Sequence, residues 1–188
     1  MGFNVENIAV FGKTPQAIFQ EASLTATHEF VDFPDDPICG ARLPSGAFGL
    51  YLNAPVFDES IIKKLSNGAS IFRLEVSETV MTTSLSALVD GQEVWSIWHD
   101  GGYQGPEHLA TSGPVPEIHE SILAEQTALL DTDDQVDFIF EVPVKLFVAL
   151  GGFRYDEDLP VDDPKPWEIL QHHSPQPSWF ARIWRGTS

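Results

Sequence analysis

The residues best suited to chemistry in this sequence are His99 and Asp100, which stand side by side with Trp95, Trp98 and Tyr103 close by. An imidazole beside a carboxylate can move protons in acid–base catalysis, and the same pair can ligate zinc or iron. A catalytic triad needs a carboxylate that orients the imidazole, but neighbours on a strand point to opposite faces. We therefore assign no catalytic residue, keep His99 and Asp100 as candidates, and expect any small-ligand site among these five residues.

The sequence motifs that mark many catalytic and cofactor sites are missing. There is no P-loop, no G-x-S-x-G elbow, no H-E-x-x-H and no paired C-x-x-C. The histidines show no helical i, i+4 pair, and the acidic run over residues 131–137 lacks the glycine and the closing glutamate of a calcium loop. We accordingly predict no cofactor and no metal site.

A second pattern combines acidic and aromatic residues over residues 154–177. This stretch is rich in Asp and Pro, which predicts an irregular segment. Aromatic side chains ringed by carboxylates are typical of surfaces that anchor a basic protein. The predicted binding residues are Tyr155, Asp156, Glu157, Asp158, Asp162, Asp163 and Trp167.

The net charge limits the range of partners. Lys and Arg number 10 against 28 Asp and Glu, for a formal net charge of −18 at pH 7. Such an excess repels nucleic acid and anionic lipid and attracts basic surfaces. We expect a basic protein partner, no nucleic acid and no membrane. The alternative explanation for the charge is solubility alone.

Length and cysteine content indicate one folded domain in a reducing compartment. A chain of 188 residues can bury enough surface to need no disulfide, and its one cysteine, Cys39, cannot form an intrachain disulfide. No secretory signal is visible at the first residues, and no apolar run approaches about 18 residues, the length of a membrane span. We expect a cytoplasmic protein of bacterial style with a single domain over residues 1–188.

Local patterns predict the elements that must position the candidate residues. Helices are expected over residues 15–23, 58–66, 116–130 and 143–151, and strands over residues 7–11, 25–33, 46–53, 70–77 and 135–142. The predicted fold is α+β, with a mainly antiparallel or mixed sheet, a central β-hairpin and three to four helices.

The hairpin is the clearest of these local signals. Asp90-Gly91 between two β-rich runs favours a two-residue turn, which would pair Thr83 with Trp98. Trp95 and Trp98 then lie on opposite faces of the ribbon.

Large apolar residues gather once more toward the end of the sequence. They predict either the last piece of the core or a surface for a homo-oligomer. These residues are Trp179, Phe180, Ile183 and Trp184.

Two functional hypotheses follow. The first is a non-enzymatic acidic binding protein that engages a basic protein partner, as an inhibitor, an immunity-type protein or a regulatory factor does. The second is a small enzyme or ligand-binding domain with its site near Trp95, Trp98, His99, Asp100 and Tyr103. The charge and the missing catalytic motifs favour the first hypothesis. A pocket in which His99 and carboxylates converge would favour the second.

Overall fold

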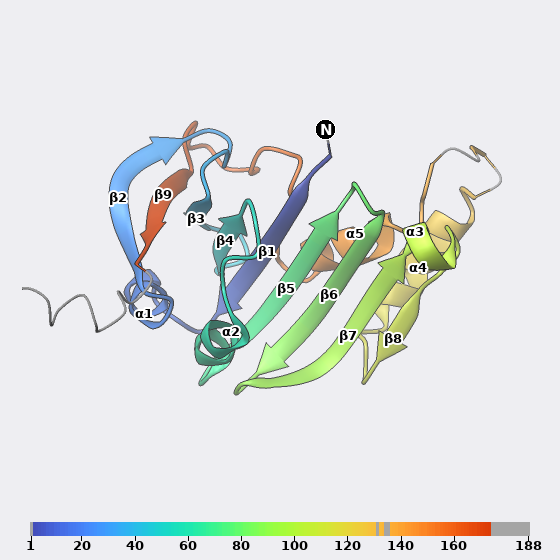
Figure 1. Ribbon diagram of the computed structural model, residues 1–188, viewed down its shortest axis with the longest axis horizontal. Coiled ribbons are helices and arrows are strands. Elements are labelled where there is room, and N and C mark those ends of the chain that lie inside the picture. The colour runs from blue at the N-terminus through green and yellow to red at the C-terminus, as the bar shows by residue number, and fades with distance from the viewer. Residues whose placement is uncertain (1, 131, 134–135, 174–188) are drawn as a thin grey trace, which may run out of the picture.

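One antiparallel sheet of nine strands organises residues 2–130, 132–133 and 136–173, the part of the chain that the computed structural model describes (Figure 1). The strand order is β2-β9-β3-β4-β1-β5-β6-β7-β8, so β1 is the central strand. The strands are β1 (Asn4–Phe11), β2 (Leu24–Val31), β3 (Ile38–Arg42), β4 (Phe48–Leu52), β5 (Ser70–Ser77), β6 (Thr82–Val89), β7 (Gln92–Asp100), β8 (Ala110–Ser112) and β9 (Trp167–His172).

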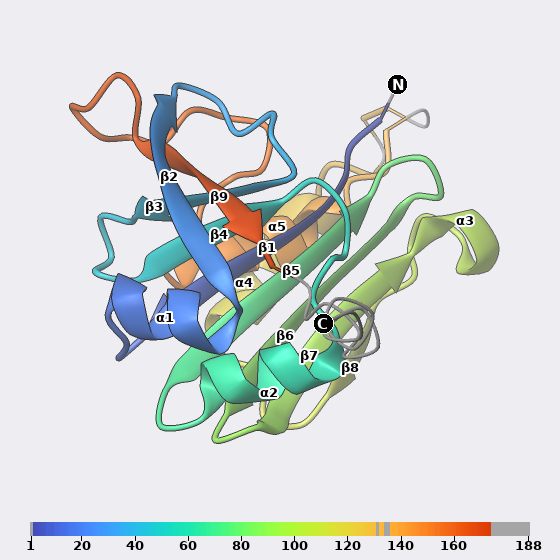
Figure 2. The same cartoon turned by 60° about the vertical axis from the view of Figure 1, so that its left-hand side comes forward.

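Helices cover both faces of the sheet, as the two views in Figures 1 and 2 show. On one side, which we call the α2 face, lie α1 (Pro15–Glu21) and α2 (Glu59–Ser66). On the other side, the α5 face, lie α4 (Ile118–Thr127) and α5 (Glu141–Ala149). The short α3 (Gly101–Gln104) follows β7 directly.

The central strand shows why two hydrophobic cores form. Successive side chains of a strand point to opposite faces, so β1 sends Ile8 and Val10 to the α2 face and Val5 and Ala9 to the α5 face. A strand that is buried on both sides has to be apolar almost throughout. The notable exception on the α2 face is Glu6, a buried carboxylate.

Helix α2 follows from local signals. The Asp58 carboxylate accepts hydrogen bonds from the backbone N–H groups of Ser60 (2.9 Å) and Ile61 (3.0 Å), which caps the helix N-terminus. Ile62 and Leu65 are fully buried and pack in the core of the α2 face. The helix expected over residues 58–66 is thus confirmed.

The predicted α+β fold with a central hairpin is wrong, because the described residues form mostly sheet. All the strands belong to one sheet, the helices are short, and the hairpin of β6 and β7 lies toward one end of it. Strands β3 and β9 pair with each other although they are distant in the sequence, and local patterns did not reveal β3. A strand was expected over residues 135–142, but the described residues 136–140 lead into α5 and residues 141–142 begin it. Pro143 fits in this helix because the first helical turn needs no N–H donor there.

A β-bulge changes the predicted register of the hairpin. Asp90 and Gly91 both have positive φ (50° and 75°), as the expected two-residue turn requires. Beyond the turn the register shifts by one residue, so that Trp98 pairs with Ser84 rather than with Thr83. A shift of one residue exchanges the faces of the paired strand. Trp98 therefore shares a face with Ser84, whereas Thr83 is buried on the α5 face and donates a hydrogen bond to the Phe140 carbonyl oxygen (3.0 Å).

Gly113 holds the chain against this bulge. Its φ is +70°, and a Cβ at this position would lie 2.3 Å from the Val94 carbonyl oxygen. We expect Gly113→Ala to lower the free energy of unfolding by about 1–3 kcal/mol, through backbone strain and this clash. Urea denaturation measures the effect. Gly46→Ala, whose Cβ would meet no atom within 4 Å at a similar φ of +87°, separates strain from clash and should cost less.

Candidate functional site

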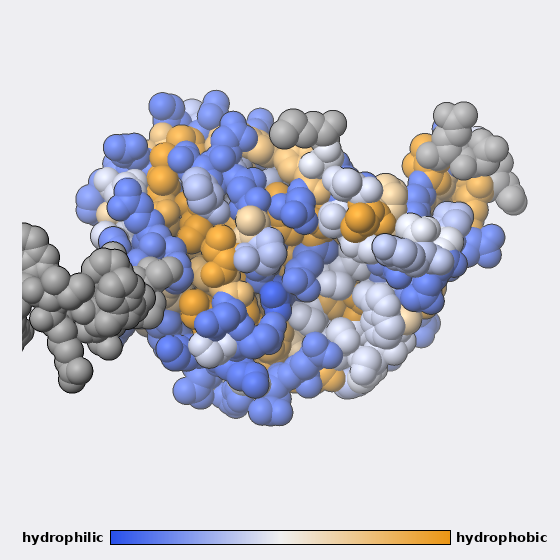
Figure 3. All heavy atoms as spheres, viewed as in Figure 1, coloured by the Kyte–Doolittle hydropathy of each residue, from blue (hydrophilic) through white to orange (hydrophobic). Residues whose placement is uncertain are grey.

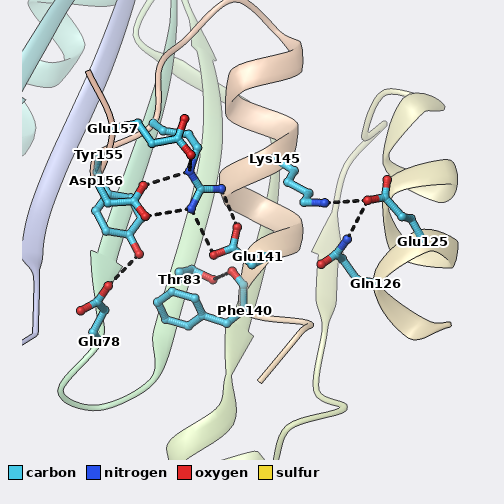
Figure 4. Close-up of polar contacts among 11 residues, drawn as sticks. Glu78, Thr83, Glu125, Gln126, Phe140, Glu141, Lys145, Tyr155, Asp156 and Glu157 are labelled. Carbon is cyan, nitrogen blue, oxygen red and sulfur yellow. Dashed lines mark hydrogen bonds and ion pairs between the residues drawn. The ribbon is translucent and has the colours of Figure 1, made fainter. Parts of the chain in front are cut away.

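The aromatic residues of the predicted acidic binding site lie in the core. Tyr155 is only 2% exposed and Trp167 only 1% exposed. The Tyr155 hydroxyl donates a hydrogen bond to Glu78 Oε1 (2.8 Å), as Figure 4 shows. Trp167 packs edge-on against Phe153, with ring centroids 5.0 Å apart. The structure therefore places neither ring where a protein partner could contact it.

The carboxylates of the same segment divide into two groups. Arg154 forms ion pairs with Asp156 (2.9 Å) and Glu157 (3.1 Å), and also with Glu141 of α5 (2.7 Å) (Figure 4). This cation partly neutralises the side of the segment next to α5. The remaining predicted residues are exposed, namely Asp158, Asp162 and Asp163.

His99 is buried beneath the sheet on the α5 face. Its Nδ1 lies 2.6 Å from the His108 carbonyl oxygen, which can only accept, so Nδ1 donates. Its Nε2 lies 2.9 Å from Asp137 Oδ2. The other Asp137 oxygen accepts a hydrogen bond from the Phe140 N–H (3.2 Å). His99 thus links the end of β7 to the turn that leads into α5.

The other residues proposed around His99 do not converge with it. Asp100 caps α3, accepting a hydrogen bond from the Tyr103 N–H (3.1 Å), and the Tyr103 side chain is 88% exposed. Trp95 is buried on the α5 face, whereas Trp98 faces the opposite side. The imidazole and the neighbouring carboxylate therefore do not form a joint site. Among the described residues, no three His, Cys, Asp or Glu side chains gather closely enough to hold a metal ion.

The structure reveals a surface that local patterns did not indicate, on the α2 face of β5, β6 and β7. Helix α2 packs over Ile71 and Leu88 and leaves the other end of these strands uncovered by any described helix (Figure 1). In Figure 3 this region is pale and hollowed, beside the strongly hydrophilic rim. We call it the open face, and it comprises Glu59, Arg73, Glu75, Ser84, Ser86, Glu93, Ser96 and Trp98.

The open face is concave, because several of its side chains are short serines. Two adjoining depressions of about 370 and 290 Å³ share Glu75, Ser84 and Trp98 in their walls. Trp98 is 40% exposed although it belongs to a regular strand. Ser84 donates a hydrogen bond to Glu75 Oε2 (3.1 Å), which holds that carboxylate beside the depressions.

The open face is negatively charged. Its single arginine, Arg73, contacts three carboxylates: Glu6 (2.7 Å), Glu59 (2.9 Å) and Glu75 (3.2 Å). Burial raises the pKa of Glu6 above its usual value, and the Arg73 guanidinium offsets part of this rise. Glu93 adds a fourth carboxylate, which accepts a hydrogen bond from Ser96 (2.9 Å). Acidic groups thus outnumber the cation on this surface.

A sequence signal for the open face exists in β6. Thr82, Ser84 and Ser86 alternate with Thr83 and Leu85, which indicates a strand with one polar and one buried face. The bulge, which local patterns do not show, aligns Trp98 with these hydroxyl groups.

A depression larger than either of those on the open face lies elsewhere, between α1 and the outer strands. It measures about 680 Å³ and has apolar walls that include Phe19, Phe30 and Phe48. Arg42, Asp163 and Glu168 stand in the same lining, so cation and carboxylates face the same space. This mixed lining favours neither a cationic nor an anionic ligand.

Comparison with models of protein families, with curated proteins and with solved structures finds no match to this chain. In the described part of the chain, no helix combines the length and apolar composition that crossing a bilayer requires. The apolar residues expected to serve in the core or in a homo-oligomer, Trp179, Phe180, Ile183 and Trp184, lie outside the described residues.

Proposed function

We propose that this protein is a non-enzymatic binding protein that engages a basic protein partner, and that the open face is the contact surface. The observation that carries the proposal is the half-exposed Trp98 beside Glu75, on a hollowed sheet surface with a carboxylate excess. Tryptophan is one of the residue types enriched among the dominant contacts of protein interfaces. The proposed site thus differs from the one expected over residues 154–167.

The chemistry of the open face favours arginine- or lysine-bearing partners. A guanidinium can lie over the indole ring of Trp98 while it forms an ion pair with Glu75 or Glu93. The serine side chains are short, so a partner backbone or side chain can approach the sheet closely. The net charge of −18 would steer a basic protein toward the molecule and raise the association rate at low salt. An inhibitor, an immunity-type protein or a regulatory factor would work in this way.

Two matched pairs of variants test the proposal. Wild-type protein immobilised at low salt is expected to retain a basic protein from a lysate of its own source and to release it at high salt. Trp98→Ala is expected to weaken the binding of that protein at least about 30-fold, in line with a central tryptophan contact. Its control, Tyr103→Ala, removes an exposed aromatic ring that does not line either depression of the open face and should leave the affinity unchanged.

The second pair separates charge from contact. Glu75→Gln/Glu93→Gln should slow association and make the association rate less dependent on salt. The control Glu117→Gln/Glu120→Gln removes the same net charge near the start of α4, on the opposite face. It should change the association rate and its salt dependence only by the small effect of that lost charge. Surface plasmon resonance at several salt concentrations measures both. Retention of no basic protein, or equal retention by wild type and Trp98→Ala, would falsify the proposal.

A further inference from the structure

We propose that the depression between α1 and the outer strands, which we call the outer pocket, binds a zwitterionic small molecule with an apolar side chain. An apolar α-amino acid is the simplest compound of this class. The outer pocket shares no lining residue with the two depressions of the open face, so this site is independent of the proposed function. The lining residues that carry the argument are Phe19, Phe30, Phe48, Arg42, Asp163 and Glu168.

Aromatic rings form the apolar walls of the outer pocket. Phe19 of α1 packs edge-on against Phe48 of β4, with ring centroids 5.6 Å apart. Gly40 makes room for this arrangement, because a Cβ there would lie 2.7 Å from Phe48 Cζ; the Phe48 ring therefore packs against the backbone of β3. Phe30 of β2 is 48% exposed in the same lining, and Figure 3 shows hydrophobic side chains over this end of the sheet. A volume of about 680 Å³ with aromatic walls is typical of small-molecule sites.

The strand register places a carboxylate and a guanidinium on the same face as these rings. Glu168 of β9 pairs with Phe30 of β2 on one side and with Gly40 of β3 on the other. Arg42 follows Gly40 by two residues, so its side chain points to the same side of the sheet as that of Glu168. One strand spacing and two residues along the strand place the two Cα atoms roughly 8 Å apart. Two long side chains at this distance can bind the opposite charges of one small molecule.

A bulge in β2 positions the carboxylate. Three residues separate Ala26 from Phe30, whereas one residue separates their partners in β9, and β2 curves strongly (Figure 1). His28 lies in this bulge with a φ of +62°, and its Nδ1 is 3.3 Å from Glu168 Oε1. The Glu168 side chain is only 19% exposed. Its carboxylate is thus held at the wall of the outer pocket.

Arg42 is free to bind a ligand. It makes no hydrogen bond or ion pair with any residue in the described part of the chain, although the protein has 28 acidic residues. By contrast, Arg73 and Arg154 each contact three carboxylates. A guanidinium without such partners can take a ligand carboxylate in bidentate geometry.

A ligand that carries both charges matches this mixed lining. Its carboxylate would pair with Arg42 and its ammonium with Glu168, while its apolar side chain would lie against the Phe48 ring. A purely anionic ligand would be repelled by Glu168 and Asp163, and a purely cationic one by Arg42. The two charges of an α-amino acid are attached to one carbon, which suits two protein groups that converge from neighbouring strands.

A titration of the wild-type protein with three related compounds, followed by amide NMR, tests the charge selection. L-phenylalanine carries both charges, hydrocinnamate only the anion and phenethylamine only the cation. We expect L-phenylalanine to bind with a dissociation constant below about 1 mM. It should bind at least about 10-fold more tightly than either analogue, because each analogue lacks one ion pair. The largest shifts are expected at Gly40 and Arg42, with none at Ser84 of the open face.

Two variants identify the charged contacts. Arg42→Met should weaken binding of L-phenylalanine at least about 10-fold without weakening that of phenethylamine, and Glu168→Gln should weaken it similarly without weakening that of hydrocinnamate. The controls Lys63→Met and Glu29→Gln remove the same charges at exposed residues that do not line the outer pocket, and should leave the affinity unchanged. Circular dichroism reports whether each variant is folded.

Each outcome decides the proposal. It is overturned if L-phenylalanine, L-leucine and L-tryptophan all fail to show saturable binding, or if hydrocinnamate binds as tightly as L-phenylalanine. Equal affinity for L-phenylalanine in wild type and in Arg42→Met also overturns it. Arg42 is exposed and unpaired in the described part of the chain, so this variant should fold even if Glu168→Gln does not. The titrations need no basic partner, so failure of the proposed function leaves their result intact.

Discussion

Replacing Arg73 by methionine is expected to lower the free energy of unfolding by about 3–5 kcal/mol at pH 7. Among the described residues, Arg73 donates the only hydrogen bond to the Glu6 carboxylate, and Glu6 Oε2 has no hydrogen-bond partner there. Without the guanidinium, a charged carboxylate would remain buried in the core of the α2 face. Urea denaturation followed by circular dichroism measures the loss.

The loss of stability in Arg73→Met should depend on pH. Burial already raises the pKa of Glu6, and loss of Arg73 would raise it further. A carboxyl group whose pKa is higher in the folded state costs stability above its unfolded pKa, and the cost disappears as the group protonates. The difference between Arg73→Met and wild type is therefore largest at neutral pH and shrinks as the pH falls toward 4.5, the ordinary value for Glu.

Two further variants make this result specific to the buried pair. Glu6→Gln/Arg73→Met removes both charges and should recover much of the stability, since replacing a whole buried ion pair is often close to neutral. Lys145→Met breaks the exposed pair with Glu125 and should cost no more than about 1 kcal/mol. Equal losses in Arg73→Met and Lys145→Met would show that Glu6 does not depend on the guanidinium.

The second large effect is expected at His99. His99→Leu should lower the free energy of unfolding by about 2–4 kcal/mol, because it leaves the His108 carbonyl and the Asp137 carboxylate without their ring partners. Amide hydrogen exchange should accelerate at Phe140, whose N–H is held by Asp137. The local effect follows from the link between the end of β7 and the start of α5.

His119, whose hydrogen bond is local, serves as the control. Within the described part of the chain, the hydrogen-bond partner of His119 Nδ1 is the carbonyl oxygen of Pro116, three residues earlier in its own turn. His119→Leu should therefore cost no more than about 1 kcal/mol and leave exchange at Phe140 unchanged. If His99→Leu also lowers the free energy of unfolding by less than about 1 kcal/mol, the buried histidine stabilises the fold only by packing, and its hydrogen bonds contribute nothing.

The burial of three aromatic side chains shows how far local patterns reach. Tyr155 and Trp167 stand in a stretch of Asp and Pro, which suggests a surface, yet both rings are buried. Trp98 stands in a regular strand, which suggests a core, yet it is exposed. Whether a ring is covered depends on which distant segments pack over it. For Trp167 these segments include Tyr51 of β4, and for Trp98 no described helix does so.

Features that depend on near neighbours could be derived from the amino-acid order alone. The Asp58 cap, the Asp90-Gly91 turn and the acidic charge are of this kind, because each rests on adjacent side chains or on composition. Three features needed the folded chain: the place of β9 between β2 and β3, the bulge that aligns Trp98 with Ser84, and the uncovered end of β5–β7. Pairing between distant strands gains its free energy only once both surfaces meet, so no local pattern encodes its partner or its register.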